Sequence, residues 1–479
     1  MPHTGAHVDY DVAVIGGGSG GYAAARTAGS AGLRTVVVEG GRQMGGLCIL
    51  RGCMPSKALL HAADVLHSAR TGAAWGLRIP KAGFDFKAVM ARKDAIVGGF
   101  ARYRQKQLTG GKFTLLRARG EFTDAHTLRL QPVPGRGAKA VPASLRARHF
   151  IIATGSTIAP APTPSLESVG YLTSDEALSL REPPRSLIVL GGGPIAVELA
   201  QFYGRMDVPV TLIQRSGQLL REFDADAAQT LARVLRREGV KLISNTRIVE
   251  AFRRGRLKGV AFAHQNRTKR VTADEILLAT GRVPNTAGLG LEKIGVALDY
   301  GRIETNASMQ TSLPHIYAAG DCTGPYAIVH IGIEQGEIAV HNILHPDRPR
   351  HIDYRLLSSI VFTSPQVAMV GLSEKSAGAR NLPYLTACYP FRDHGKSLIM
   401  EATDGFVKLL ADPATGEILG GSCVGPSGGE LLHEIIAAMH KRMTVHELAA
   451  MPHYHPTLSE IWTYPAAELA ERIPLPSPS

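Results

Sequence analysis

The chain begins with an apolar segment, a glycine-rich turn and a helix built from small residues. Apolar side chains dominate Tyr10–Ile15, which predicts a strand, and the alanine-rich Tyr22–Ala31 predicts a helix. Thr35–Val38 is a second apolar run and predicts another strand. A strand, a helix and a strand in this order are typical of an α/β fold with a parallel sheet.

The turn between the first predicted strand and the helix has a spacing that suits phosphate binding. Gly16, Gly18 and Gly21 form the pattern Gly-x-Gly-x-x-Gly. Glycine lets the backbone approach a pyrophosphate, and the helix N-terminus favours its negative charge. Glu39 ends the second predicted strand, where a carboxylate accepts hydrogen bonds from ribose hydroxyls. These four residues predict a dinucleotide-binding unit rather than a chance glycine-rich turn.

A second unit of the same kind begins near residue 186. The apolar run Leu187–Leu190 precedes a turn with Gly191 and Gly193, and a predicted helix over Ala196–Arg205 leads to a strand over Val208–Ile213. Two such units in one chain suggest one hydride donor and one electron-carrying cofactor.

The end of this later strand differs from the first unit. Gln214 stands where an acid is expected, and Arg215 and Arg221 follow it. A 2′-phosphate is bound by arginines and repelled by a carboxylate. We therefore expect NADP(H) to be preferred over NAD(H). The alternative is that both arginines merely face water.

The other periodic segments predict further elements, and from about His351 the pattern changes to short strands followed by helices. Two runs, Lys112–Arg119 and Thr127–Leu130, predict a hairpin. Helices are predicted at Ser56–Ala69, Phe86–Leu108, Glu430–Arg442 and Thr444–Ala450, and strands at His149–Ile152, Glu275–Ala279, Ile316–Ala319, Ser359–Phe362 and Gly405–Ala411.

Composition adds limits to this picture. A chain of 479 residues, 44% hydrophobic and 20% charged, predicts several globular domains. Its net charge of +12 is scattered rather than blocked, which argues against nucleic-acid binding. Met1–Tyr10 lacks a signal-peptide pattern, and no apolar run is long enough to span a membrane, so we expect a cytoplasmic location. The Pro- and Ser-rich tail, Pro474–Ser479, is expected to be loose.

Cysteine usage points to redox chemistry. Five cysteines are too few for a secreted disulfide framework, yet Cys48 and Cys53 are separated by only four residues. A zinc site would need two more ligands with matching spacing, and no second cysteine pair exists, so no metal is expected. The other reading is two unrelated buried cysteines.

The spacing of this pair restricts its backbone. Residues five apart in a regular helix are separated by roughly 7.5 Å along the axis, whereas a disulfide tolerates Cα atoms up to about 7 Å apart. The stretch between Cys48 and Cys53 therefore cannot be regular helix if the two bond. Gly52 and Pro55 fit a distorted turn that leads into a helix, whose N-terminus would lower the pKa of a nearby thiol.

A thiol pair needs a base that takes and returns a proton. His455 is a candidate because histidine titrates near neutral pH, and Glu460 could fix its tautomer. The chain has 18 histidines, so spacing alone does not single out this one.

Together these motifs resemble the class I pyridine nucleotide–disulfide oxidoreductase family, which includes dihydrolipoamide dehydrogenase, glutathione reductase and mercuric reductase. The resemblance runs from about Asp9 to Glu468. The matching motifs are Gly16-x-Gly18-x-x-Gly21 with Glu39, Cys48-x4-Cys53-x-Pro55-Ser56-Lys57, Ala153-Thr154-Gly155, Gly191-x-Gly193 with Glu198, Thr280-Gly281-Arg282-x-Pro284-Asn285, Tyr317-Ala318-Ala319-Gly320-Asp321 and His455-Pro456-Thr457-x-Ser459-Glu460.

The resemblance implies a domain order and an assembly. FAD would be bound by residues 1–158 together with 285–350, NAD(P) by residues 159–284, and residues 351–479 would form an α+β dimerisation domain. It implies a homodimer in which His455 and Glu460 serve the cysteine pair of the other subunit.

The resemblance also implies residue roles. Cys48 would be the interchange thiol that meets the substrate, and Cys53 would lie against the flavin. His455 would be the acid–base catalyst with Glu460 as its orienting group. Lys57 and Glu198 would pair near the reactive flavin nitrogen. The implied cofactor contacts are Gly16, Gly18, Gly21, Glu39, Gly46, Ala153, Thr154, Gly155, Gly191, Gly193, Arg215, Arg221, Gly281, Arg282, Gly320 and Asp321, with Asp321 on the FAD ribitol.

Departures from the family concern the substrate. Leu47 and Leu50 replace the usual threonine and asparagine around Cys48 and make the pair's surroundings less polar. Arg26, like Ser19, agrees with a glutathione-contacting position of glutathione reductase, but Glu337 stands where that enzyme has an arginine and would repel a glutathione carboxylate. Other departures are Pro194, in place of a gating tyrosine, and Pro365-Gln366, in place of Pro-Glu.

The resulting expectation is an FAD-dependent NAD(P)H:disulfide oxidoreductase, with a small or carrier-bound lipoamide-like dithiol or disulfide as its first candidate substrate. A reductase of a glutathione-like disulfide is the alternative within the class. A mercuric-ion, quinone or oxygen reductase is an alternative of another activity, although the chain lacks the extra C-terminal thiol pair of mercuric reductase. The intact set of Cys48, Cys53, His455 and Glu460 argues against a non-catalytic flavin-bound subunit.

Overall fold

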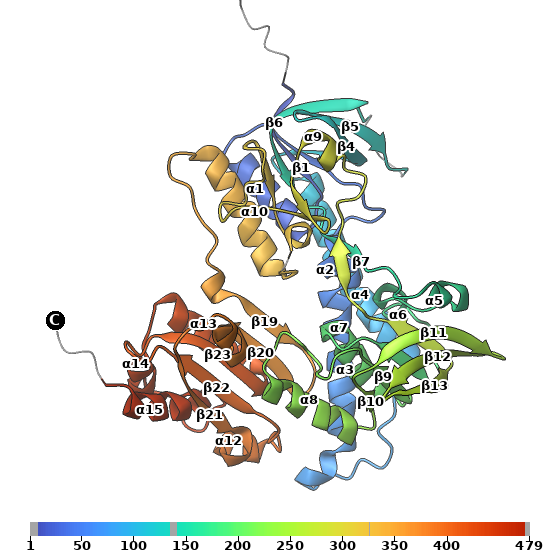
Figure 1. Ribbon diagram of the computed structural model, residues 1–479, viewed down its shortest axis with the longest axis vertical. Coiled ribbons are helices and arrows are strands. Elements are labelled where there is room, and N and C mark those ends of the chain that lie inside the picture. The colour runs from blue at the N-terminus through green and yellow to red at the C-terminus, as the bar shows by residue number, and fades with distance from the viewer. Residues whose placement is uncertain (1–7, 135–140, 325, 475–479) are drawn as a thin grey trace, which may run out of the picture. The chain divides into compact units, whose positions relative to one another are not determined.

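The computed structural model describes residues 8–134, 141–324 and 326–474 (Figure 1). The expectations about residues 1–7 and about the tail from residue 475 lie outside the described residues. The chain forms two compact units, each made of three segments: Met1–Pro55, Arg92–Ala159 and Gly281–Ile352 in the first, and Ser56–Ala91, Pro160–Thr280 and Asp353–Ser479 in the second. No helix within the described ranges is long and apolar enough to cross a membrane.

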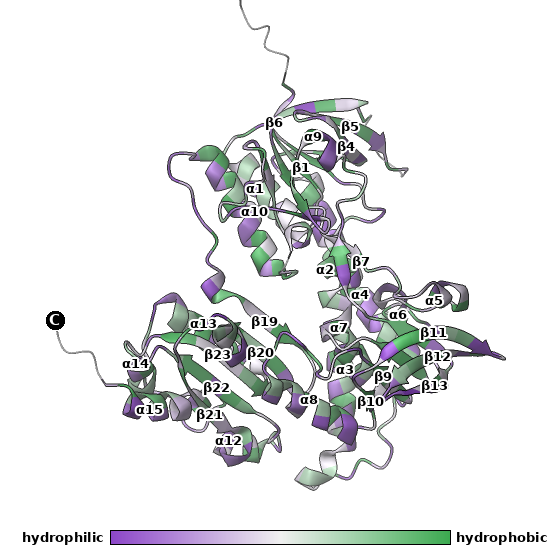
Figure 2. Ribbon diagram, viewed as in Figure 1, coloured by the Kyte–Doolittle hydropathy of each residue, from purple (hydrophilic) through white to green (hydrophobic). Residues whose placement is uncertain are grey.

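The first unit is built on a mostly parallel sheet. Its strands follow the order β3-β2-β1-β6, with β18 also paired to β6. The strand bounds are β1 Tyr10–Ile15, β2 Thr35–Val38, β3 Thr114–Leu116, β4 Ala118–Asp124, β5 Thr127–Pro132, β6 Ser144–Ile152, β7 Ser156–Ile158, β15 Arg282–Pro284, β16 Leu298–Asp299, β17 Arg302–Ile303 and β18 Ile316–Ala318. The two strands predicted at the start of the chain are confirmed, and most of their residues are buried. The hydrophobic colour of β1 can be followed in Figure 2.

The predicted hairpin is wrong in one part. Its second strand is β5, but Lys112–Arg119 divides into β3, which pairs parallel with β2, and the first residues of β4, which pairs antiparallel with β5. Arg117 separates the two strands, and its guanidinium donates hydrogen bonds to the carbonyl oxygens of Glu39 and Gly41. The parallel partner of β3 is β2, which is distant in sequence, so the local pattern could not predict this pairing.

Helices α1 (Ser19–Ser30) and α10 (Val329–Leu344) lie side by side in this unit (Figure 1). Glycines permit the close contact: a Cβ added at Gly20 would lie 2.6 Å from the carbonyl oxygen of Gly332, and one at Gly336 would lie 2.5 Å from that of Gly20. This unit also contains α2 Gly46–Arg51 and α9 Leu291–Ile294. Two further helices run through a unit boundary, α3 Cys53–Arg70 and α4 Phe86–Thr109.

The second unit contains another parallel sheet, of order β10-β9-β8-β14. Its strands are β8 Leu187–Leu190, β9 Val210–Ile213, β10 Lys241–Ile243 and β14 Glu275–Leu278, and its helices are α5 Pro164–Val169, α6 Ser174–Ala177, α7 Pro194–Arg205 and α8 Ala225–Arg237. A three-stranded antiparallel sheet, β11 Arg247–Arg254, β12 Leu257–His264 and β13 Arg267–Ala273, was not predicted from the sequence. Charged residues on its exposed face obscure the apolar alternation there.

The C-terminal segment of the second unit forms an antiparallel sheet of order β19-β20-β23-β22-β21. Trp462 and Leu432 are fully buried in its core. The bounds are β19 Ser358–Val361, β20 Gln366–Gly371, β21 Leu385–Pro390, β22 Phe406–Ala411, β23 Ile418–Gly425, α11 Glu374–Ala379, α12 Gly395–Ile399, α13 Gly428–His440, α14 Val445–Ala450 and α15 Thr463–Arg472. The predicted change of pattern near residue 351 thus marks a true α+β segment.

Candidate active site

The first glycine turn is shaped by backbone contacts that exclude any side chain. Gly16 has φ +105°, and a Cβ there would lie 2.4 Å from the carbonyl oxygen of Ala153. A Cβ at Gly21 would lie 1.9 Å from the carbonyl oxygen of Gly16, so this glycine lets the helix pack on the strand. A Cβ added at Gly18 would meet only the Cα of Gly46, at 4.0 Å, so the N-terminus of α1 stays open.

Glu39 lies against this turn. Its carboxylate accepts the backbone N–H of Gly17 at 2.7 Å and that of Gly41 at 2.6 Å. The side chain is therefore fixed at the end of β2, beside the helix N-terminus, although the two motifs are separated in sequence. The glycine turn and the carboxylate fit the pyrophosphate and ribose hydroxyls of a dinucleotide.

A second set of predicted cofactor residues converges in the same unit. The short strands β7 and β15 pair with each other. Ser156 donates a hydrogen bond to Asp321 at 2.6 Å, and Arg282 donates to the hydroxyl and the carbonyl of Ser156 at 2.8 Å. The side-chain oxygen of Gln335 accepts a hydrogen bond from the backbone N–H of Gly320 at 2.7 Å. Segments at or next to the motifs that begin at Ala153, Thr280 and Tyr317 thus form one polar cluster, which fits the hydroxyl-rich part of FAD.

The cysteine stretch has the interrupted helix that its spacing predicted. Cys48 lies in α2, Gly52 interrupts the helix with φ −132° and ψ −111°, and Cys53 begins α3. A Cβ at Gly52 would lie 3.1 Å from the carbonyl oxygen of Leu47, which favours glycine at this bend. Both cysteines are half-buried.

Two glycines and a leucine support the start of this stretch. Gly46 has φ +74°, and its Cβ would lie 2.8 Å from the Cα of Gly18, so the stretch is seated against the glycine turn. Leu50 fills the space beside Gly45, where a Cβ would lie 3.0 Å from its Cγ. Leu50, which stands where the family usually has asparagine, therefore also has a packing role.

Lys57 and Glu198 form the expected ion pair in the second unit. The Lys57 ammonium lies 2.9 and 3.1 Å from the two oxygens of Glu198, whose side chain is 5% exposed. The backbone N–H of Phe362 donates to Glu198 at 2.9 Å, and the Lys57 ammonium lies 4.5 Å from the centre of the Phe362 ring. Because the carboxylate is buried and held by two donors, it fixes the direction of the lysine.

The structure also brings together His455 and Glu460. The Nδ1 atom of His455 lies 2.9 Å from one carboxylate oxygen and 3.2 Å from the other. The side chain of His455 is 76% exposed, whereas that of Glu460 is 10% exposed. The buried carboxylate thus holds one ring nitrogen and leaves Nε2 as the nitrogen that can exchange a proton with another group.

Sequence reasoning missed His394. Its Nε2 atom lies 3.3 Å from Glu460 Oε1, an oxygen that also lies 3.2 Å from His455 Nδ1. His394 follows an unremarkable short strand and is separated from Glu460 by 66 positions, so no local pattern could have found it.

The second glycine turn repeats the first with one informative change. Gly191 has φ +135°, and its Cβ would lie 2.2 Å from the carbonyl oxygen of Ala279, whereas a Cβ at Gly193 meets nothing within 4 Å. Gln214 is buried beneath the turn, where a Cβ at Gly192 would lie 1.7 Å from its Oε1 atom. A neutral amide therefore occupies the place that Glu39 has in the first unit.

Arg215 and Arg221 lie exposed on the connection between β9 and α8. The guanidinium of Arg221 lies 3.5 Å from the carboxylate of Glu222, which is also exposed. Both predicted arginines therefore lie on the segment that follows β9, the second strand of this unit, where an adenosine phosphate would be met.

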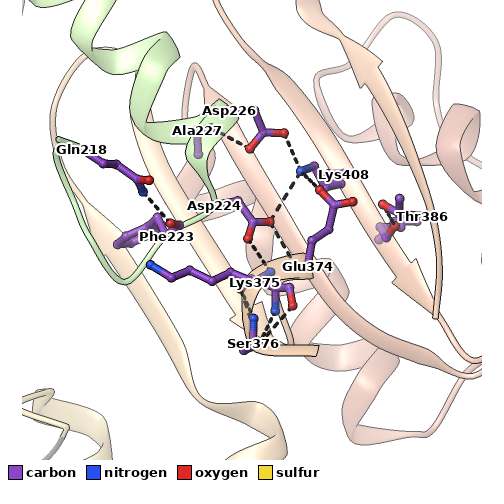
Figure 3. Close-up of polar contacts among 12 residues, drawn as sticks. Gln218, Phe223, Asp224, Asp226, Ala227, Glu374, Lys375, Ser376, Thr386 and Lys408 are labelled. Atoms are coloured by element: carbon purple, nitrogen blue, oxygen red, sulfur yellow. Dashed lines mark hydrogen bonds and ion pairs between the residues drawn. The ribbon is translucent and has the colours of Figure 1, made fainter. Parts of the chain in front are cut away.

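A charge network around the buried Lys408 supports this connection (Figure 3). The ammonium of Lys408, on β22, lies 2.5 Å from Asp226, 2.6 Å from Glu374 and 3.5 Å from Asp224. Burial by itself lowers the pKa of Lys408, but hydrogen bonds to Asp226 and Glu374 outweigh it and raise the pKa. Asp224 also accepts the N–H groups at the start of α11, from Glu374 and Lys375.

Lys375 completes the link between this network and the arginine-bearing segment. Its ammonium donates a hydrogen bond of 2.5 Å to the carbonyl oxygen of Arg221. The segment 214–224 is thus tied to α11 and β22 of the C-terminal sheet, within the same unit (Figure 3).

Two dinucleotide-type units, an interrupted helix with two cysteines and a buried carboxylate–histidine pair define an oxidoreductase of the flavoprotein disulfide type. Residues 10–336 match the pyridine nucleotide–disulphide oxidoreductase family, and residues 357–466 match the dimerisation domain of that family. The chain belongs to the pyridine nucleotide–disulfide oxidoreductases. It is an FAD-dependent enzyme, and its dimerisation domain makes it a homodimer.

Relatives match along almost the whole chain. The dihydrolipoyl dehydrogenase of Chlamydia trachomatis serovar D is 34% identical over 477 residues, covering 98% of each chain, and that of Geobacillus stearothermophilus is 33% identical over 470 residues, covering 98% of this chain and 97% of the other. Among solved structures, LpdA of Mycobacterium tuberculosis has a TM-score of 0.85 and 29% identity, covering 96% of this chain and 99% of its own. The HOCl-induced flavoprotein disulfide reductase RclA of Escherichia coli has a TM-score of 0.83 and 26% identity, with the same coverage.

Proposed function

We propose that this enzyme passes electrons between NADP(H) and a lipoamide-like dithiol or disulfide, through FAD and the pair Cys48 and Cys53. FAD, held by residues 1–158 and 285–350, supplies the two-electron chemistry. Residues 159–284 bind the nicotinamide nucleotide, and residues 351–479 form the dimer interface. The observation that carries the proposal is the cysteine pair at an interrupted helix, in a chain that also holds the His455–Glu460 pair at 2.9 Å.

The thiol chemistry follows from these residues. When both thiols are reduced, the Cys48 thiolate attacks a sulfur of the substrate disulfide, and a mixed disulfide forms. His455, protonated at Nε2, gives its proton to the departing substrate thiolate. Cys53 then attacks Cys48, which closes the Cys48–Cys53 disulfide and releases the second substrate thiolate. Dithiol oxidation is the reverse sequence, with His455 accepting the proton.

Lys57 and Glu198 act at the nicotinamide side of this route. The buried Glu198 keeps the Lys57 ammonium in one position, so a fixed positive charge is available where hydride arrives. The predicted phosphate and hydroxyl contacts of FAD are Gly16, Gly18, Gly21, Glu39, Gly46, Ala153, Thr154, Gly155, Gly281, Arg282, Gly320 and Asp321, and those of the nicotinamide nucleotide are Gly191, Gly193, Arg215 and Arg221.

The choice of NADP(H) rests on the absence of a carboxylate at Gln214. This amide is buried and bonded to the carbonyl of Ser216 at 2.8 Å, so it adds no negative charge beside Arg215 and Arg221. Two exposed guanidinium groups on the adjacent segment suit a 2′-phosphate. Dihydrolipoyl dehydrogenase-like chemistry with NADP(H) would distinguish this enzyme from NAD-dependent relatives.

A turnover panel tests the proposal: NADH against NADPH, each with lipoamide, oxidised glutathione, Hg(II) and a quinone. We expect the highest kcat/KM with NADPH and lipoamide. His455→Ala should reduce lipoamide turnover far more than quinone turnover, because a quinone takes electrons without a thiolate leaving group. Equal losses with both acceptors would instead favour a quinone reductase. The expected cytoplasmic location stays a prediction.

A further inference from the structure

Two histidines lie against the carboxylate of Glu460, and the thiol chemistry explains only one of them, His455. The other, His394, is 0% exposed and precedes helix α12. Its ring lies edge-on to Phe391 and Tyr464, with centroid distances of 6.4 and 6.3 Å. Because this side chain is shielded from solvent, its role must come from the groups that it touches.

Both ring nitrogens of His394 face oxygen atoms. Nδ1 lies 2.8 Å from the hydroxyl of Ser397, which is itself fully buried. Nε2 lies 3.3 Å from Oε1 of Glu460, without the alignment of a hydrogen bond, and has no hydrogen-bond partner among the described residues. The Glu460 carboxylate is the acceptor that this nitrogen faces.

Electrostatics selects one tautomer. If the proton were on Nδ1, the Nε2 lone pair would face a carboxylate oxygen and repel it. With the proton on Nε2, the ring donates toward Glu460, and Nδ1 accepts the hydroxyl hydrogen of Ser397. Burial lowers the pKa of His394, so the ring stays neutral at neutral pH although Glu460 opposes this shift.

We propose that His394 is a positioning residue for the catalytic base: as a neutral imidazole it donates its Nε2 proton to Glu460 and holds that carboxylate charged and directed at His455. The hydrogen-bond chain is then Ser397 to His394 to Glu460, with His455 donating from Nδ1 to the same carboxylate. The inference deepens the proposed function and rests on His455 being its base.

The physical need for a second donor comes from burial. A carboxylate that is 10% exposed loses most of its hydration and stays ionised only when donors replace the lost water. His455 is mostly exposed and supplies one donor, and His394 supplies a donor that solvent cannot displace. A neutral donor suits this position, because a second cation would neutralise Glu460 and weaken its pull on His455. The charged or titratable groups around His394 are Glu460, His455, Tyr464 and, on its own short helices, Asp393 and Lys396.

The test compares His394→Leu, which removes the donor, with His394→Gln, whose side-chain amide can place an N–H near the former Nε2. The measurement is kcat/KM for dihydrolipoamide oxidation against pH, whose acid limb reports the base of the free enzyme. We expect His394→Leu to lower kcat/KM about tenfold, as for loss of a hydrogen bond to a charged group. We also expect the acid limb to move to lower pH by up to about one unit, since a less firmly charged Glu460 makes His455 less basic. His394→Gln should restore most of the lost kcat/KM and bring the acid limb most of the way back to its wild-type position.

Controls separate positioning from folding. NADPH–quinone turnover and flavin content should stay within about twofold in both variants, because neither needs the thiol-side base. Should His394→Leu not fold, Ser397→Ala provides the second variant, and it should shift the acid limb in the same direction by a smaller amount.

Two results would overturn the inference. One is an unmoved acid limb in a folded His394→Leu enzyme, and the other is an equal loss in the Leu and Gln variants. A wild-type enzyme that fails to oxidise any dithiol while reducing quinones would instead refute the proposed function, so the two failures are distinguishable.

Discussion

Arg26 on α1 and Glu337 on α10 form an ion pair, with 2.8 Å between Nη2 and Oε1. The arginine agrees with a position that contacts glutathione in glutathione reductase, but here its charge is already matched within the protein. We therefore expect the pair to work against a substrate carboxylate in two ways, by occupying Arg26 and by adding a negative charge next to it.

We expect Glu337→Gln to raise kcat/KM for oxidised glutathione by about two- to fivefold, the range for freeing one partner of an exposed ion pair. Lipoamide is uncharged and should be unaffected. The measurement is steady-state turnover with both disulfides at low and high salt, since screening should reduce the gain. No change with glutathione would mean that Arg26 does not face the substrate.

Arg215→Glu should raise the KM for NADPH by roughly 10- to 100-fold, because a charge-assisted hydrogen bond to phosphate is replaced by repulsion. The KM for NADH should change by less than about twofold, since NADH has no phosphate at this position. Arg256→Glu, an exposed change on the β11–β12 turn, controls for net charge. An unchanged coenzyme preference in Arg215→Glu would contradict the phosphate assignment.

Lys408→Met should destabilise the enzyme by about 1–3 kcal/mol, because the buried carboxylate of Asp224 loses its charged partner. The loss is limited because Asp226 and Glu374 are 45% and 36% exposed and can be hydrated. The pKa of Lys408 is raised above the ordinary 10.5, so the lysine's contribution is complete below that pH and is lost only as pH rises through the higher folded value. The stability gap between wild type and variant should therefore be constant from neutral pH to about pH 9. Denaturant titration measures the free energy of unfolding, and Lys441→Met, a change at an exposed lysine, is the control. A loss of stability no larger than that of the control would show that Lys408 does not support segment 214–224.

Subunit complementation tests the shared active site. Neither Cys48→Ser nor His455→Ala alone should turn over lipoamide at an appreciable rate. Co-expression gives hybrid dimers in which one site has both an intact cysteine pair and an intact histidine if the two come from different subunits. Activity should then return to about a quarter of wild type for random mixing of subunits in a two-fold dimer. No recovery, in a sample shown to contain hybrids, would place His455 and the cysteines of one working site on the same subunit.

Thiol alkylation separates reactive from structural cysteines. Burial raises the pKa of Cys322 to about 11, and burial likewise raises the pKa of Cys388 to about 11 although its surface is partly exposed. Cys423 is fully buried, and its pKa is also raised. In the reduced enzyme, iodoacetamide near neutral pH should therefore label Cys48 first, Cys388 slowly and the two buried thiols only after unfolding. Peptide mass spectrometry reads the order, and early labelling at Cys322 would contradict it.

Local patterns sufficed wherever the chemistry lies within a short stretch of chain. The glycine turns at Gly16 and Gly191 were predictable because a strand, a turn and a helix are adjacent in sequence. The break at Gly52 followed from the reach of a disulfide against the rise of a helix. The family motifs also named His455, which its position among 18 histidines could not.

The tertiary structure decided the contacts between distant segments. It joined Ser156, Arg282 and Asp321, and it placed β3 beside β2 where the sequence suggested a hairpin. It also placed Lys408 among three carboxylates and His394 against Glu460. Such pairs leave no periodic trace, because periodicity reports only which face of an element is buried, not which residue of another segment lies against it. The sequence by itself therefore determined the class of chemistry and its thiols, and the packing of distant strands decided which polar groups hold the base in place.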